Sequence, residues 1–238
     1  GALGTAACLD EHKFDKEIAE AIVGNFRTSG AKGFRGCILY EPELQKNGWK
    51  FFYNRELSNP HPHFEAWLWA CYLWFYEQTG WDSLLERTKL GIKETLDTYP
   101  DGWFWTNGIQ QERARMILPL AWLYRVEPTQ EPEQYPDFMV DDLLKNQAPR
   151  GGSREQLADP SKSTFGKTPS NEKYGESEAP LIFDNGDPIA DMLYTTNFAF
   201  VGLCEAAAAT HKPEYIEALE RMNDFLIRIQ VRSEEFKH

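Results

Sequence analysis

Residues 63–79 read HFEAWLWACYLWFYEQT, and nearly every position of this helix-length stretch is apolar or aromatic. The segment that follows, residues 82–99, carries its apolar side chains on a single stripe. A helix that is hydrophobic on all sides is buried on all sides, whereas a helix with one apolar stripe covers a core and faces water. The two segments therefore predict a helical hairpin with an inner and an outer helix.

The same pairing occurs twice more along the chain. Residues 108–125 (GIQQERARMILPLAWLYR) predict an inner helix before an outer helix at residues 135–147, and residues 188–210 (PIADMLYTTNFAFVGLCEAAAAT) predict another before residues 213–233. A further one-stripe helix is expected at residues 15–25. Repeated hairpins of this kind pack into rings or stacked arrays. We therefore expect an all-α fold, an α/α hairpin toroid represented by about three and a half hairpins.

Composition limits the domain organisation and the partners. With 238 residues, 42% of them hydrophobic, the chain is expected to form a single domain after an irregular segment at residues 1–12. A formal net charge of −12 argues against a nucleic-acid partner, because a polyanion would be repelled. No membrane span is expected, since Glu65, Glu112 and Asp191 interrupt the apolar segments.

The four cysteines lack the spacing of a metal site. Cys71 and Cys204 lie within inner helices and are expected to be small core residues. Cys8 and Cys37 flank irregular sequence, and whether they form a disulfide stays open. No CxxC motif or Cys/His cluster occurs, so we expect neither a metal nor a cofactor, and the sequence shows no signal peptide.

Chemistry is expected in the long connections that lead from each outer helix to the next inner helix, at residues 28–62, 100–107 and 148–187. In a hairpin array all inner helices begin at the same end, so these connections gather beside the N-termini of the buried helices. Long loops in compact domains are usually functional. The substrate-binding candidates at this end are Trp103, Trp105, Asn107, Arg113, His63, Arg35, Arg154, Tyr174 and Asn197.

The stretch PDGWFWTNGIQQER at residues 100–113 is the densest in functional side chains. The rings of Trp103 and Trp105 are suited to stacking on the apolar face of a sugar, although both could instead fill the junction between hairpins. Glu112 lies about one turn into a buried helix, where an isolated carboxylate is costly. It is therefore either functional or paired with a base such as Arg113.

Two aspartates mark the start of the third inner helix. Asp187 and Asp191 are four residues apart and share a helix face, so they could divide acid and base duties if their environments separate their pKa values. Asp187 precedes a proline, which is also the pattern of an ordinary N-cap followed by a first-turn residue.

The polar residues at the start of the first inner helix and in the long connections are less specific indicators of function. Glu65 and His63 begin the first inner helix without sharing a face, so they do not form a ready metal pair. The long connections carry more positive charge than the rest of the chain. Arg35 or Arg154 could therefore hold the carboxylate of an acidic sugar such as a uronate, or these could simply be solvated loops. Asn197 could bind a ligand or a nearby backbone group.

The segments WFWTNGIQQERARMILPLAWLYRVE (residues 103–127) and DPIADMLYTTNFAFVGLCEAAAAT (residues 187–210) resemble the six-hairpin glycosidase superfamily, the (α/α)6 toroids. They look most like uncharacterised bacterial secreted proteins of this kind. The resemblance covers roughly residues 64–232 and implies a secreted or periplasmic glycoside hydrolase that degrades an oligosaccharide or polysaccharide. It also implies catalytic carboxylates near the N-terminal ends of inner helices. The positions that match are Glu65, Glu112, Asp187 and Asp191.

A full toroid needs six hairpins, so we expect a fragment, an open arc, or a ring completed by a second copy or a missing segment. We expect Glu112 to act with Asp187 or Asp191. Two other functions stay open. One is a sugar epimerase or isomerase that uses His63 or another base. The other is a non-catalytic module that binds a glycan or a protein.

Overall fold

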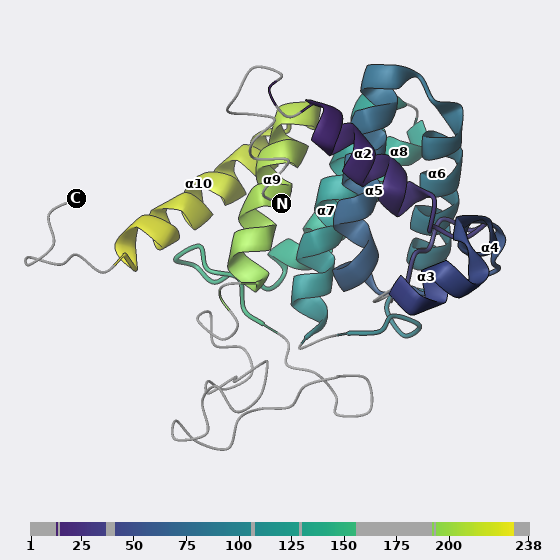
Figure 1. The fold of residues 1–238 in the computed structure, drawn as a ribbon. Coiled ribbons are helices and arrows are strands. Elements are labelled where there is room, and N and C mark those ends of the chain that lie inside the picture. The colour runs from purple at the N-terminus through teal and green to yellow at the C-terminus, as the bar shows by residue number, and fades with distance from the viewer. Residues whose placement is uncertain are drawn as a thin grey trace, which may run out of the picture. The chain divides into compact units, whose positions relative to one another are not determined.

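A computed structural model describes residues 13, 15–36, 41–105, 108–128, 130–155, 192 and 194–230, with backbone only for residues 130–136 (Figure 1). Every named element among these residues is an α-helix, which confirms the all-α class. The chain divides into two compact units, Gly1–Phe104 and Trp105–His238. The toroidal arrangement and the single domain stay predictions.

The first unit contains the first predicted hairpin and the preceding helix. Its elements are α2 (Asp15–Phe26), α3 (Glu41–Asn47), α4 (Trp49–Asn54), α5 (Pro62–Thr79) and α6 (Asp82–Asp97). Helix α5 packs against α6 and against α2. Helices α3 and α4 lie where only a loop was expected. In α3, acidic residues in the first turn and Lys46 in the last turn complement the helix dipole, which stabilises a short helix.

Close packing joins α5 to α6. Trp69 of α5 is fully buried, and a Cβ added to Gly91 of α6 would lie 2.7 Å from Cζ2 of its ring. Only glycine therefore lets the two helices approach this closely. The expectation that Cys71 lies in the core is wrong, because Cys71 is exposed. In this unit α5 packs against α2 and α6, and these helices leave uncovered the side that carries Cys71.

Arg87 of α6 holds the loop at residues 28–36 against the rest of the first unit. Its Nη1 donates hydrogen bonds to the carbonyl oxygens of Gly30 (2.9 Å) and Tyr53 (2.6 Å), and its guanidinium lies 3.5 Å from the centre of the Tyr53 ring. Gly33 adopts a φ of 84°, and a Cβ there would lie 2.1 Å from the carbonyl oxygen of Arg87. The loop is thus fixed by a planar cation and a residue that must be glycine.

The second unit contains the second and third predicted hairpins. Its elements are α7 (Ile109–Val126), α8 (Gln130–Leu144), α9 (Thr195–Thr210) and α10 (Pro213–Arg228). Helix α7 packs against α8 and α9, and α10 packs against α9, so the two inner helices are neighbours (Figure 1). Helix α8 begins at residue 130 rather than 135. Pro132 lies in its first turn, where a proline removes no needed hydrogen bond. Cys204 of α9 is half-buried rather than a core residue.

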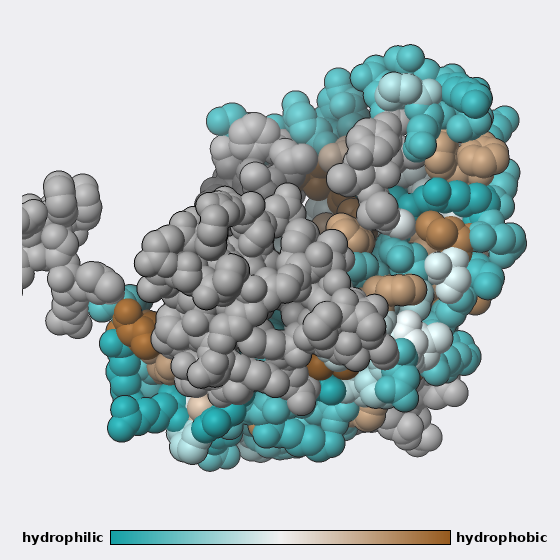
Figure 2. All heavy atoms as spheres, turned by 90° about the horizontal axis from the view of Figure 1, so that it is seen from below, coloured by the Kyte–Doolittle hydropathy of each residue, from teal (hydrophilic) through white to brown (hydrophobic). Residues whose placement is uncertain are grey.

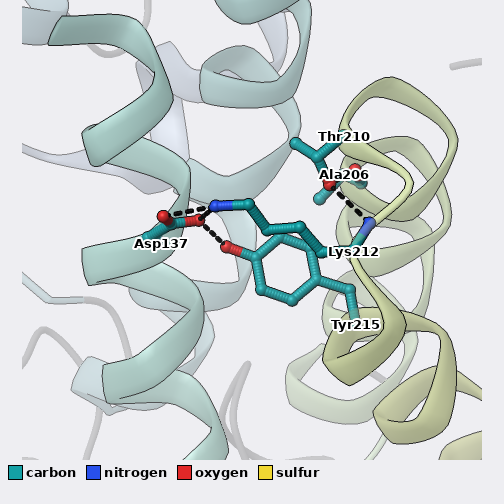
Figure 3. A network of polar contacts seen from close by, with 5 residues as sticks. All are labelled: Asp137, Ala206, Thr210, Lys212 and Tyr215. Carbon is teal, nitrogen blue, oxygen red and sulfur yellow. Dashed lines mark hydrogen bonds and ion pairs between the residues drawn. The ribbon is translucent and has the colours of Figure 1, made fainter. Parts of the chain in front are cut away.

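The outer helices α8 and α10 are tied by the polar network in Figure 3. The carboxylate of Asp137 accepts hydrogen bonds from Nζ of Lys212, at 2.5 Å to Oδ1, and from the hydroxyl of Tyr215. Burial, together with the hydrogen bond to Asp137, raises the pKa of the Tyr215 hydroxyl. The backbone N–H of Lys212 donates to Oγ1 of Thr210 at 3.4 Å, which closes the end of α9.

In the face shown in Figure 2, hydrophilic residues predominate and the hydrophobic ones form small, separate patches. Within the described part of the chain, no helix combines the length and the apolar character that crossing a membrane requires.

Candidate functional site

The start of α7 carries four buried polar residues, Gln110, Gln111, Glu112 and Arg115, which we call the α7 polar segment. The helix then continues with buried apolar residues from Met116 to Ala121. Burial of polar groups is costly unless they are paired or used, so each member of the segment needs a physical reason.

Gln110 serves the structure. Its Nε2 donates hydrogen bonds to the carbonyl oxygen of Leu143 at 2.8 Å and to Oγ of Ser153 at 3.3 Å. Its Oε1 accepts a hydrogen bond from Nη1 of Arg113 at 3.0 Å. The side chain of Gln110 therefore joins α7 to the end of α8 and to the segment that follows it.

Gln111 is different. Its side-chain oxygen and nitrogen are both buried, and neither has a hydrogen-bond partner among the residues that the structure describes. Leaving a buried amide unpaired costs about 1–3 kcal/mol per group. The sequence offered no signal for this difference, because two adjacent glutamines look alike until their neighbours are known.

Glu155 joins the starts of α7 and α9 and was not among the expected site residues. Its Oε1 accepts a hydrogen bond from the backbone N–H of Gln110 at 3.1 Å, and its Oε2 accepts one from the hydroxyl of Thr195. A carboxylate at two helix N-termini is favoured by the helix dipoles. Its partners are distant in sequence, so local pattern gave no indication of this role.

Arg115 brings an aromatic contact to the same segment. Its guanidinium lies 3.8 Å from the centre of the Phe198 ring and 5.8 Å from that of Tyr194, both near the start of α9. A cation on an aromatic face is attracted to the ring, the more so where water is excluded. Asn197, expected to bind substrate, is half-buried in the same turn of α9.

Glu65 occupies a separate place in the first unit. Its Oε1 accepts hydrogen bonds from the backbone N–H of Gly36 at 2.6 Å and from Nδ2 of Asn59 at 3.3 Å, and its Oε2 accepts one from the N–H of Arg35 at 3.1 Å. Burial raises the pKa of the carboxyl to about 7, although these hydrogen bonds oppose the shift. Glu65 therefore fixes the end of the loop at residues 28–36 and titrates near neutral pH.

A buried hydroxyl lies two turns further along α5. Within the described part of the chain, the hydroxyl of Tyr72 has no hydrogen-bond partner. Burial and, to a lesser extent, the charge of Glu65 raise its pKa. Tyr72 was not among the expected site residues, because an aromatic residue in an apolar helix is usually core.

The tryptophans differ in their surroundings. Trp103 is buried, and its indole N–H donates a hydrogen bond to the carbonyl oxygen of Thr95 at 2.6 Å. Its ring also meets Tyr99 at 4.7 Å between centroids, which favours a packing role over a sugar platform. Trp105 is half-buried at the start of the second unit.

The remaining candidates are placed as follows. Arg35 is half-buried, and its Nε donates a hydrogen bond to Oγ1 of Thr28 at 3.2 Å. His63 is half-buried beside the ring of Phe64, at 4.8 Å between centroids. Arg154 is exposed. Four predicted residues, and the two N-terminal cysteines, lie outside the described residues: Asp187, Asp191, Asn107, Tyr174, Cys8 and Cys37.

Among the residues that the structure describes, no three His, Cys, Asp or Glu side chains come together so as to hold a metal ion. Comparisons of the chain with models of protein families, with curated proteins and with solved structures find no match. The resemblance to six-hairpin glycosidases therefore stays a prediction.

Proposed function

We propose that this protein is a carbohydrate-active enzyme, specifically a glycoside hydrolase that uses two carboxyl groups. The proposal is carried by Glu112, which lies fully buried in the first turn of α7. Fully buried ionisable groups are common at catalytic sites, where the surroundings adjust their pKa values, so this position favours a role in chemistry. Gln111, whose amide has no hydrogen-bond partner among the described residues, precedes Glu112 in the helix, and Arg115 lies one turn further on. Buried polar groups of this kind occur where hydroxyl-rich ligands bind.

The second carboxyl in this proposal is Asp187 or Asp191, which belong to the same unit as Glu112 by sequence. One carboxyl protonates the glycosidic oxygen as the bond to the anomeric carbon breaks. The other removes a proton from the attacking water, or itself attacks the anomeric carbon. A separation of about 5–5.5 Å between the carboxyls would give retention, and roughly 6.5–9.5 Å would give inversion.

Glu65 is assigned a structural role in this proposal. Both of its oxygens already accept hydrogen bonds from the loop and from Asn59, which leaves them poorly placed to exchange protons with a substrate. Its pKa of about 7 would suit a general acid, but the hydrogen bonds from Arg35, Gly36 and Asn59 already engage both oxygens.

The test is mass spectrometry after incubation of the purified chain with neutral and uronate-containing oligosaccharides. We expect a shorter product that disappears in Glu112→Gln and Asp191→Asn and persists in Glu86→Gln, which alters an exposed carboxylate on α6. Hydrolysis that survives in both of the first two variants would overturn the assignment. An isomer of unchanged mass would instead identify an epimerase, and binding without turnover would identify a binding module.

A further inference from the structure

Gln110 and Gln111 are adjacent residues of the same helical turn, and both are 0% exposed. The first has its donor and acceptor atoms satisfied by Leu143, Ser153 and Arg113, while the second has neither atom satisfied. Gln110 therefore serves as a control for Gln111, because both amides are buried and only that of Gln110 is hydrogen-bonded to residues that the structure describes.

An unpaired buried amide lowers stability, and a methionine of similar shape would avoid that cost. A polar group kept where it opposes folding is typical of a functional site. Burial alone thus gives no reason for glutamine at residue 111. A ligand that binds the side-chain amide would give one.

The surroundings of Gln111 indicate the chemistry of that partner. Glu112 follows it directly, and Arg115 shares its helix face one turn on, with Phe198 against the guanidinium. An amide offers one acceptor and two donors without charge. Neighbouring hydroxyl groups, each of which donates and accepts, match this set.

We propose that the side-chain amide of Gln111 binds a pair of hydroxyl groups on a neutral sugar unit and so helps to determine which substrate the site accepts. This inference rests on the proposed carbohydrate function and adds a specificity-determining residue to it. Because both amide atoms are closed to solvent, the sugar reaches them only when neighbouring side chains move.

The test compares Gln111→Met with Gln110→Met in thermal unfolding of the full chain. Without sugar, we expect Gln111→Met to unfold at the wild-type temperature or about 2–4 °C higher, since a buried unpaired group is removed. Gln110→Met should unfold at a lower temperature, because it removes the hydrogen bonds that Gln110 makes with the carbonyl of Leu143, Oγ of Ser153 and the guanidinium of Arg113. Gln111→Leu serves as a second variant in case methionine does not fit.

The same proteins are then titrated with neutral disaccharides of glucose, mannose, galactose and xylose. We expect at least one of them to raise the unfolding temperature of the wild type and of Gln110→Met, with an affinity at least tenfold weaker in Gln111→Met. The proposal is overturned if Gln111→Met is as destabilised as Gln110→Met, if it binds as tightly as the wild type, or if no disaccharide binds the wild type.

The two proposals fail in different ways. Sugar binding that depends on Gln111 but yields no product would contradict the hydrolase and keep this inference. Hydrolysis with an unchanged KM in Gln111→Met would contradict this inference and keep the hydrolase. A buried water as the partner of the amide would leave sugar binding unaffected by Gln111→Met, and so would also overturn it.

Discussion

Oε1 of Glu65, in the first turn of α5, accepts a hydrogen bond from the backbone N–H of Gly36 at 2.6 Å. With the bond from Arg35 to Oε2, this contact holds the last residues of the described loop through a carboxyl that is 1% exposed. Burial opposes ionisation and the backbone donors favour it, so the same group both fixes the loop and responds to pH.

The pKa of Glu65 predicts how stability changes with pH. Its value in the folded state is about 7, compared with the ordinary value of 4.5, so the fold favours the protonated form. Its contribution to stability is fully present below pH 4.5 and is lost as the pH rises through 7. The difference corresponds to about 3 kcal/mol, an order-of-magnitude figure from 1.36 kcal/mol per pKa unit.

The variant that checks this is Glu65→Gln, studied by urea unfolding from pH 4 to pH 8. The amide cannot ionise, so the stability of the wild type relative to the variant should fall as pH rises through this range. The amide also loses one hydrogen bond to the loop, which adds an offset that does not depend on pH. Glu86→Gln, at an exposed site on α6, should follow the wild type. A constant difference between wild type and Glu65→Gln would contradict the shift.

Arg87→Lys should destabilise the first unit by about 1–3 kcal/mol, because an ammonium cannot reach several carbonyl oxygens while stacking on a ring. The guanidinium now contacts the carbonyls of Gly30 and Tyr53 and the Tyr53 ring. The measurement is urea unfolding, together with hydrogen exchange at the N–H of Gly33, which should quicken.

The control for this prediction is Arg228→Lys on α10. Arg228 forms an exposed pair with Asp224 at 3.7 Å, and such pairs contribute about 0–1 kcal/mol. Equal losses for the two lysine variants would show that the contacts of Arg87 do not hold the loop.

Asp137→Asn should weaken the attachment of α10 to α8 and cost about 1–2 kcal/mol in unfolding free energy. The asparagine loses the charge that attracts Lys212 and accepts the hydroxyl of Tyr215 less strongly (Figure 3). Asp97→Asn, which alters an exposed pair with Lys93, is the matched control and should change stability little. Equal unfolding free energies for the two variants would show that the network contributes no more to stability than an exposed ion pair.

The three hairpins were predictable from sequence because a helix with apolar residues on nearly every face and one with a single apolar stripe leave different patterns. Complete burial of the inner helices was not correct, since α5 exposes Cys71 and α9 exposes Val201. Helices α3 and α4 were not, since Phe52 is their only buried residue and their sequence lacks an apolar stripe. The role of Glu155 was also invisible, because its partners Gln110 and Thr195 are 45 and 40 residues away. Composition likewise could not show that Trp103 is buried rather than open to a sugar.

Three glycines within helices differ in the space around them, so substitution by alanine is expected to change stability differently at each. Alanine is favoured over glycine in a helix by about 1 kcal/mol, so Gly24→Ala should stabilise the protein, because nothing lies within 4 Å of the new Cβ. In Gly202→Ala the Cβ would lie 3.0 Å from Cβ of Ile117 on α7, so the propensity gain is offset by separation of α7 and α9. In Gly91→Ala it would lie 2.7 Å from the buried ring of Trp69.

We therefore expect Gly24→Ala to unfold at the highest denaturant concentration, followed by wild type, Gly202→Ala and Gly91→Ala. The last should lose about 1–3 kcal/mol, the usual cost of overpacking a rigid core. Because Gly202 and Gly91 belong to different units, each variant tests the packing of one unit. Stabilisation by Gly202→Ala would contradict the close approach of α7 and α9 at Gly202 and Ile117.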